Sequence, residues 1–469
     1  MSSQRKDYDW RTPPSNYSGL QVHAPFLGAP ASSRHVGYPQ ERPLPARCWR
    51  SPGRRLRISM LDVQEAQNIV LQHTPPGRAV TLPLESAPDH YLAVDVIADM
   101  DVPPFDRAAM DGYALRAEDV QATPAFLEVI GESPAGLVPT FTIGHGQAAR
   151  IMTGAVVPAG ADAVQMVEKT EAGEAERRVR VLMPVGVGDN ITRRGVEVRR
   201  GQKVLTAGRY LGAGEIAVLA MFGHVSVLVW QKPTVAVLAT GDELVEPCEN
   251  PKPGQIRNSN SYALAAQLRT VGLQATRLTV AKDTKADLRM RIVEGLAYDL
   301  LLLTGGVSMG KYDLVEEILA ELGIAVFFDH VAIKPGKPVV FGRKGDGLIF
   351  GLPGNPVSSY VTFECLVRPA LLKWMGGPTD ALLMVTGELE NRIKQKPGRM
   401  AFLPAWSVWD HGRWSVKVLP SKGSADIVAF SLANSLFVFP KDRTVYEPGD
   451  PVSVLLLDDF FRRRRATGL

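Results

Sequence analysis

Four short loops hold the residues of this sequence whose types and spacing are best suited to chemistry. The loops are TGDE (240–243), TGGVSMGKYD (304–313), IKPGKP (333–338) and GLPGNPVSS (351–359). Asp242, Glu243 and Asp313 offer hard oxygen ligands of the kind that Mg²⁺ prefers. Lys334 and Lys337 flank a Pro-Gly turn and supply positive charge for an oxyanion. Carboxylates, lysines and glycines together predict a site in which a metal ion bridges the protein to a phosphate.

The glycines of these loops allow a ligand to approach the backbone closely. Gly305 and Gly306 permit a positive φ and, with the backbone of Gly354, offer N–H donors for phosphate. Asn355 is a good N-cap and Pro356 a good first residue, so we expect a helix to begin there. Each loop taken singly is better explained as an ordinary turn with solvated charges. Four such loops at one edge of a sheet would favour a ligand site.

Each loop follows an apolar run that predicts a buried strand. Residues 300–303 are four leucines followed by a glycine pair, a pattern typical of a strand buried on both faces of a parallel sheet. Apolar residues at helical spacing from Leu314 to Leu322 predict a helix after it. Strands and helices alternate in this way over 231–378, which indicates a parallel α/β domain. Because ligands bind at the carboxyl ends of such strands, we expect the four loops to gather at one edge.

The remaining patterns predict three further regions. Asp62 with Glu65 forms a capping box that begins the first helix. Alternating strands that carry Trp406, Trp409 and Trp414 predict an all-β C-terminal domain. The expected regions are a split N-terminal domain (60–104 and 191–230), an inserted β-rich domain (105–190), the α/β domain (231–378) and the C-terminal β domain (379–460), between basic tails at 1–59 and 461–469.

Composition excludes several classes of protein. The chain has 469 residues, of which 45% are hydrophobic and 22% charged, so it is too long for a single core. No stretch approaches the roughly 18 apolar residues of a membrane span, and the N-terminus lacks the apolar region of a secretory signal. The isolated cysteines Cys48, Cys248 and Cys365 exclude a CxxC-type metal site and fit a reducing, cytoplasmic compartment.

The N-terminal segment is strongly basic. Residues 1–57 hold ten Arg or Lys, three acidic residues and eight prolines, which predicts disorder. Basic tails can bind nucleic acid, but we favour a solvated tail without that role. We therefore expect either that Met60 is the native start or that the preceding residues are dispensable for dimer formation and activity.

The motifs resemble those of the molybdopterin molybdenumtransferase family of molybdenum cofactor biosynthesis, to which the C-terminal domain of gephyrin belongs. TGGVSMG, AIKPGKP and GLPGNPVS carry the resemblance together with PFDRAAMDGYA, RIMTGAVVP and NITRRG, in order from Leu61 to Pro451. It implies a two-piece N-terminal domain, an inserted β domain, a molybdopterin-binding α/β domain, a C-terminal β-barrel and a homodimer. It also implies that molybdate and adenylylated molybdopterin give molybdenum cofactor and AMP, with Mg²⁺ assisting.

The resemblance assigns roles to individual residues. Glu243 and Asp313 stand where the family has acidic residues near Mg²⁺ and the nucleotide phosphates, and they are our candidate metal ligands. Asp111 and Thr153 match positions that the family presents from the inserted domain, across the dimer interface, and complete our candidate catalytic set. The residues expected to bind the pterin nucleotide are Asp242, Asp283, Gly305, Gly306, Ser308, Gly354 and Asn355.

A second group is expected to hold molybdate. Lys334, Lys337 and Ser358 match family residues that bind this anion, and Arg399 and Ser424 match an arginine and a serine that the barrel contributes. The protein need not supply a nucleophile, because the two thiolates of the pterin replace oxygens on molybdate.

The chain departs from the family pattern at three places. Glu197 stands where relatives often have aspartate, and His90-Tyr91 replaces a common Gly-Arg. The acidic residue expected after the strand RLTV falls on either Lys282 or Asp283, depending on a one-residue gap.

Two other functions stay open from the sequence. One is a molybdopterin adenylyltransferase, which is usually the α/β unit alone. The other is a cofactor carrier or scaffold without turnover. Candidate protein partners for an enzyme at this step are a molybdopterin adenylyltransferase and molybdoenzymes.

Overall fold

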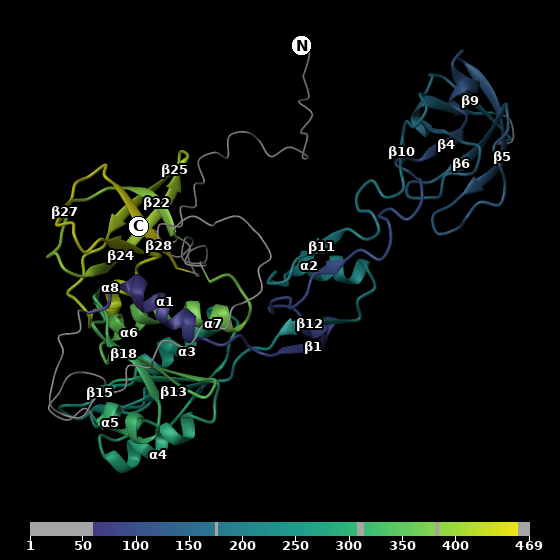
Figure 1. Cartoon of the computed structure of the whole chain (residues 1–469). Helices are drawn as coiled ribbons and strands as arrows, with labels where there is room; N and C mark the ends of the chain where they lie inside the picture. The colour runs from purple at the N-terminus through teal and green to yellow at the C-terminus, as the bar shows by residue number, and fades with distance from the viewer. Residues whose placement is uncertain (1–59, 174–176, 307–313, 380–383, 458–469) are drawn as a thin grey trace, which may run out of the picture. The chain divides into compact units, whose positions relative to one another are not determined.

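The protein is described from a computed structural model of residues 60–173, 177–306, 314–379 and 384–457 (Figure 1). The described residues form two compact units, one of residues 60–79 with 230–457, and one of residues 80–229. Ser308 and Asp313 lie outside the described residues, as do the basic tails. In the described part of the chain, no helix is long and apolar enough to cross a membrane.

The first unit contains a six-stranded sheet. Its strands lie in the order β16 (Ala275–Arg277), β13 (Val235–Ala239), β17 (Leu300–Thr304), β21 (Gly347–Leu352), β20 (Pro338–Lys344) and β18 (Ala325–His330). The first four strands pair in parallel, and every residue of β17 is buried, as the leucine run predicts. β20 is antiparallel to both β21 and β18, because a two-residue turn joins β20 to β21. β18 therefore runs in the same direction as β13, β17 and β21.

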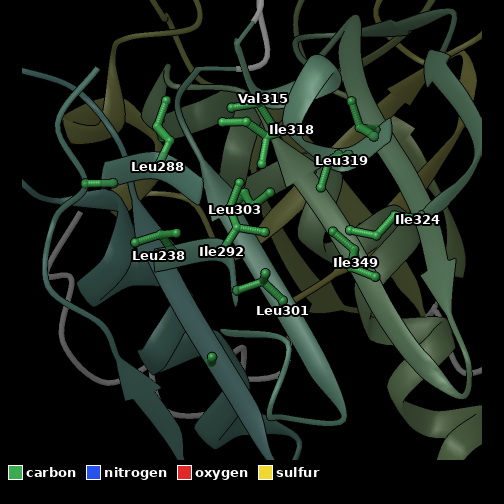
Figure 2. Packing of buried hydrophobic residues seen from close by; sticks show 13 residues of the cluster. Leu238, Leu288, Ile292, Leu301, Leu303, Val315, Ile318, Leu319, Ile324 and Ile349 are labelled. Atoms are coloured by element: carbon green, nitrogen blue, oxygen red, sulfur yellow. The ribbon is translucent and has the colours of Figure 1, made fainter. Parts of the chain in front are cut away.

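Helices cover both faces of this sheet. α4 (Lys285–Gly295) and α5 (Leu314–Glu321) pack against one face, and α3 (Asn260–Thr270) lies on the other, against α6 (Pro356–Thr362). Figure 2 shows the apolar side chains under α4 and α5. They include Leu238, Leu288, Ile292, Leu301, Leu303, Val315, Ile318, Leu319, Ile324 and Ile349.

A long helical segment follows the last loop of the sheet. α6 leads into a π-helical turn (Phe363–Val367) and then into α7 (Arg368–Trp374). A buried ion pair of 2.5 Å between Arg368 Nε and Glu364 Oε2 lies along it. Asn355 occupies the N-cap position as expected, with Pro356 first in the helix, but its side chain makes no capping hydrogen bond.

α1 (Val63–His73) packs on α7 within the same unit. The predicted capping box is confirmed, since Glu65 N donates to Asp62 Oδ1 at 2.8 Å and Asp62 N donates to Glu65 Oε2 at 2.9 Å. Gln67 Nε2 also donates to the carbonyl oxygen of Cys365 at 2.9 Å. The sequence grouped this helix with the split N-terminal domain; in the structure it contacts α7 and the π-helical turn before it.

The C-terminal region forms a β-barrel, which confirms this part of the expected fold. Pairing of β24 with β26 closes the ring β24, β25, β22, β28, β26. The short strand β19 (Ile333–Lys334), which comes from the α/β domain, adds to β24 in parallel. The remaining elements of this region are β22 (Met384–Leu389), β23 (Ile393–Lys394), β24 (Met400–Asp410), β25 (Arg413–Val418), α8 (Ile427–Ser431), β26 (Ser435–Phe439), β27 (Val445–Tyr446) and β28 (Pro451–Leu456).

The second unit is mainly β. A six-stranded sheet has the order β7 (Ala163–Met166), β4 (Gly112–Leu115), β6 (Gln147–Ile151), β5 (Ala125–Ser133), β9 (Arg178–Val181) and β8 (Thr170–Ala172). Among the described residues, three two-stranded sheets and one α-helix accompany it: β1 (Ala79–Pro83) with β12 (Ser226–Trp230), β2 (Val96–Ile97) with β11 (Lys203–Leu205), β3 (Arg107–Ala108) with β10 (Ile191–Thr192), and α2 (Ala213–Met221). The chain thus combines an α/β domain with β-rich parts, the fold class that the sequence predicts.

Candidate functional site

The described parts of the four predicted loops lie at one edge of the six-stranded sheet. They follow β13, β17, β18 and β21, which all run in the same direction, so their carboxyl ends meet there. β17 and β21 lie between β13 and β18 in the strand order. The glycine loops are therefore placed between the carboxylate loop and the lysine loop.

Gly305 lies where two of these loops pack closely together. Thr240 N donates to Thr304 O at 3.0 Å, and Gly305 N donates to Leu352 O at 3.2 Å. Gly305 has a φ of 93°, and a Cβ atom there would lie 2.5 Å from Thr240 O. A Cβ atom on Gly354 would lie 3.6 Å from the Cα atom of Gly305. The close packing of the two loops therefore requires a residue without a side chain at Gly305. The same absence leaves the backbone open to a ligand.

Asn260, the first residue of α3, joins these loops and was not identified from the sequence. Its Nδ2 donates to Thr304 Oγ1 at 2.9 Å and to the carbonyl oxygen of Gly354 at 2.7 Å. An asparagine at a helix start is common as a cap, so its residue type alone gave no sign of this cross-loop role.

The carboxylates follow β13. Asp242 and Glu243 are exposed, and the Glu243 carboxylate lies back over Gly241, where a Cβ atom would be 2.5 Å from Glu243 Oε2. Asp283 N donates to Asp242 Oδ1 at 3.2 Å, which brings these two expected nucleotide-binding residues together. The sequence left open whether Lys282 or Asp283 occupies the family's acidic position. In the structure Asp283 is bonded to Asp242, whereas Lys282 N donates to Asp287 Oδ2 at 2.8 Å.

The carboxylate loop fits Mg²⁺ as a partial ligand set. Within the described ranges, no group of three or more His, Cys, Asp or Glu side chains could hold a metal ion by itself. Mg²⁺ commonly takes only one or two protein carboxylates and completes its octahedron with water and substrate phosphates. Asp242 and Glu243 can meet that requirement, and Asp313, the other expected ligand, lies outside the described residues.

The residues expected to bind molybdate are brought together by backbone contacts. Pairing of β19 with β24 sets Lys334 opposite Ala401, two residues after Arg399. The turn between Lys334 and Lys337 rests on α6, since a Cβ atom on Gly336 would lie 2.6 Å from Thr362 Cγ2 and 3.5 Å from the carbonyl oxygen of Ser358.

Ser358 and Ser424 complete this neighbourhood. Ser358 is buried in α6, only four residues after Gly354, so the same helical segment links the glycine loop to the lysine turn. Val357 N donates to the carbonyl oxygen of Ser424 at 3.1 Å, which holds the loop before α8 against the start of α6.

An open cleft of about 660 Å³ adjoins Lys334. It is lined by Lys334, Arg392, Lys394, Gln395, Lys396, Thr444 and Val445. Four of these side chains are cationic, so the cleft is suited to an anion. Lys334 Nζ donates to Gln395 Oε1 at 2.7 Å, a contact that the sequence did not reveal.

In the second unit, Asp111 and Thr153 are paired. Thr153 donates to Asp111 Oδ1 from its backbone N at 2.7 Å and from its hydroxyl at 3.0 Å. The backbone N–H first, and then the hydroxyl, lower the pKa of Asp111 below its ordinary value. Both side chains are exposed, so this ionised carboxylate is available to a ligand. Glu197, which replaces the family's frequent aspartate, forms an ion pair of 2.9 Å with Arg107.

Comparison with protein families accounts for nearly all of the described chain. Residues 61–223 match the MoeA N-terminal region (domain I and II), residues 236–373 match a probable molybdopterin binding domain, and residues 386–457 match the MoeA C-terminal region (domain IV).

Curated relatives and a solved structure agree with this division. The molybdopterin molybdenumtransferase of Bacillus subtilis is 34% identical over 404 residues, covering 85% of this chain and 94% of the relative. That of a Nostoc species is 35% identical over 413 residues, with the same shares. The crystal structure of a molybdopterin biosynthesis MoeA protein from Pyrococcus horikoshii superposes with a TM-score of 0.73 at 32% identity, over 85% of this chain and 99% of the other. The chain therefore belongs to the molybdopterin molybdenumtransferase family and is an enzyme of molybdenum cofactor biosynthesis.

Proposed function

We propose that this enzyme inserts molybdenum from molybdate into adenylylated molybdopterin and releases AMP, with Mg²⁺ as its metal ion. The observation that carries the proposal is the order of loops along the sheet edge. Carboxylates follow β13, cations follow β18, and glycine loops follow the strands between them. At about 4.8 Å per strand, the carboxylate and lysine loops lie roughly 15–20 Å apart. A long substrate, with a nucleotide at one end and a dithiolene at the other, can lie along such an edge.

The cationic end suits molybdate. This dianion needs fixed positive charge, which Lys334 and Arg399 supply beside the buried α6. Lys334 lines the basic cleft, and its half-buried position strengthens its attraction for an anion relative to open water. Ser358 and Ser424 add hydroxyl groups that can donate hydrogen bonds to its oxygens. The chemistry requires no nucleophile from the protein, because the substrate's own thiolates displace the oxygens of molybdate.

The acidic end suits the nucleotide phosphates. Asp242 and Glu243 would hold Mg²⁺ together with phosphate oxygens, and Asp313 joins them on the strength of the family motif. When bound, the ion would neutralise charge on the phosphoanhydride as AMP leaves. The backbone of Gly305 and Gly354 allows the phosphate chain to lie close to the loops.

The pair of Asp111 and Thr153 supports a role for the second unit. A carboxylate held ionised by two hydrogen bonds remains available as a fixed negative charge at neutral pH. We propose, from the family resemblance, that the enzyme is a homodimer and that the partner subunit brings this pair to the site.

Release of AMP tests the proposal. Purified protein is incubated with adenylylated molybdopterin, Mg²⁺ and molybdate, and AMP is measured, with reactions lacking molybdate or Mg²⁺ as controls. The insertion reaction requires all components, and Lys334→Ala should require more molybdate. An adenylyltransferase would instead consume ATP and molybdopterin and release pyrophosphate, and a carrier would bind the pterin nucleotide without releasing AMP. Either result would overturn the proposed function.

A further inference from the structure

Gln395 lies at the wall of the basic cleft, and its backbone is hydrogen-bonded there. It directly follows β23, which pairs with β27 through Ile393 with Tyr446 and Lys394 with Val445. Its backbone N donates to the carbonyl oxygen of Thr444 at 3.1 Å. The backbone position of Gln395 is therefore set by the β23–β27 pair of the C-terminal region and not by the α/β domain.

The side chain of Gln395 reaches across to the α/β domain. Its Oε1 accepts a hydrogen bond of 2.7 Å from Lys334 Nζ, and both residues are half-buried. Lys334 is fixed at its backbone by pairing with Ala401 in β24. The hydrogen bond therefore fixes the far end of a flexible four-carbon side chain whose near end is already held.

The choice of an amide as partner has an electrostatic consequence. In the described ranges, Lys334 has no carboxylate within ion-pair distance, whereas Arg392 in the same cleft pairs with Glu447 at 2.9 Å. An amide oxygen orients the ammonium group but carries no net charge, so the full positive charge of Lys334 remains for a ligand. A carboxylate in its place would orient the lysine equally well and cancel most of its charge.

We propose that Gln395 is a positioning residue of the anion site: it holds Lys334 in the cleft without neutralising it. The inference rests on the proposed function, in which Lys334 binds molybdate. Gln395 itself needs no contact with the substrate, since its effect passes through the lysine. Nearby Lys394 and Lys396 repel an unheld ammonium group, which makes a fixed partner for Lys334 more important.

Steady-state kinetics with varied molybdate test this role. Gln395→Ala should raise the KM for molybdate roughly tenfold, as expected for a misplaced charge-assisted contact, and leave kcat within about twofold. Gln395→Glu should raise the KM at least as much, because it pairs the lysine with a negative charge. Gln274→Ala, at an exposed glutamine before β16, is the matched control and should behave as the unaltered protein.

A double-mutant cycle distinguishes positioning from an independent contact. If Gln395 acts only through Lys334, Gln395→Ala should add little to the effect of Lys334→Ala, so that the combined variant resembles Lys334→Ala alone. Additive effects, or an unchanged KM in Gln395→Ala, would overturn the inference. If Lys334→Ala is also without effect on the molybdate dependence, the proposed anion site fails with it.

A readout that does not depend on turnover completes the test. Lys334 is acylated with an amine-reactive reagent, and the extent of modification is followed by mass spectrometry of its peptide. Labelling should be faster in Gln395→Ala, which frees the amine, and slower in Gln395→Glu, which pairs it with a carboxylate. Equal labelling rates in all three proteins would show that the hydrogen bond does not hold the lysine in solution.

Discussion

At the scale of single residues, opposite charges share one sheet edge without neutralising each other. Asp242 and Glu243 follow β13, whereas Lys334 and Lys337 follow β18 at the far side of the sheet. Because two glycine-loop strands lie between them, the acidic and basic groups are too far apart to pair and remain available to ligands. Each group should therefore respond separately to substitution.

Replacing Glu243 tests the acidic group. Glu243→Gln keeps the size of the side chain and removes its charge, so AMP release should fall sharply and recover partly at high Mg²⁺, while the molybdate dependence stays the same. Asp346→Asn is the matched control, because this exposed carboxylate lies in the turn between β20 and β21, at the opposite edge of the sheet. Normal turnover of Glu243→Gln at ordinary Mg²⁺ would remove Glu243 from the metal site.

Residue types were predictable from the sequence, but pairwise contacts between distant residues were not. Motifs identified the lysines and carboxylates because their types and order along the chain carry that information. Asn260 bonds to residues 44 and 94 positions away, and Gln395 bonds to one 61 positions away. Such contacts depend on the register of elements that meet only in the folded chain, so a common asparagine or glutamine gave no local signal.

At the scale of elements, the first turn of α3 fastens the loops after β17 and β21. Asn260→Ala removes both hydrogen bonds and should lower the free energy of unfolding by about 1–3 kcal/mol. It should also weaken binding of the pterin nucleotide, since the link from α3 to Thr304 and Gly354 would be lost. Asn260→Asp should act at least as strongly, because it sets a carboxylate against a carbonyl oxygen. Unfolding and nucleotide titrations that match the unaltered protein in both variants would exclude this role.

The docking of α1 should depend on pH. His73 stacks on Phe327 with ring centroids 3.7 Å apart, and burial, followed by the charges of Arg343 and Lys373, lowers the pKa of His73 below 6.5. The unfolded chain therefore binds a proton on His73 at a higher pH than the folded chain does. The free energy of unfolding should have its full value above pH 6.5 and fall as the pH drops below it. Urea unfolding between pH 8 and about pH 5 should show this loss, and His73→Phe should abolish it. If His73→Phe lost the same amount of stability over this pH range, other titrating groups would be its cause.

Elements were predictable from the sequence where the pattern that indicates them lies in neighbouring residues. The buried leucine run of β17 and the capping box of α1 depend on neighbouring residues, and both were read correctly. The antiparallel direction of β20, the attachment of β19 to the barrel and the side on which α1 packs depend on contacts between distant segments. None of these three had a pattern of its own in the sequence.

At the scale of the whole molecule, the proposed anion site draws on two domains of one unit. Lys334 and Ser358 come from the α/β domain, whereas Arg399, Ser424 and Gln395 come from the barrel region. Either domain alone would thus have an incomplete set of the expected anion ligands.

The molybdenum recovered in the pterin product, measured against the AMP released in the same reaction, tests the central claim most directly. The account predicts equal molar amounts of the two and neither product when molybdate is omitted. Lys334→Ala should keep this ratio and need a higher molybdate concentration to reach it. Release of AMP without molybdenum in the pterin, or recovery of the adenylylated pterin intact under saturating molybdate and Mg²⁺, would contradict the account.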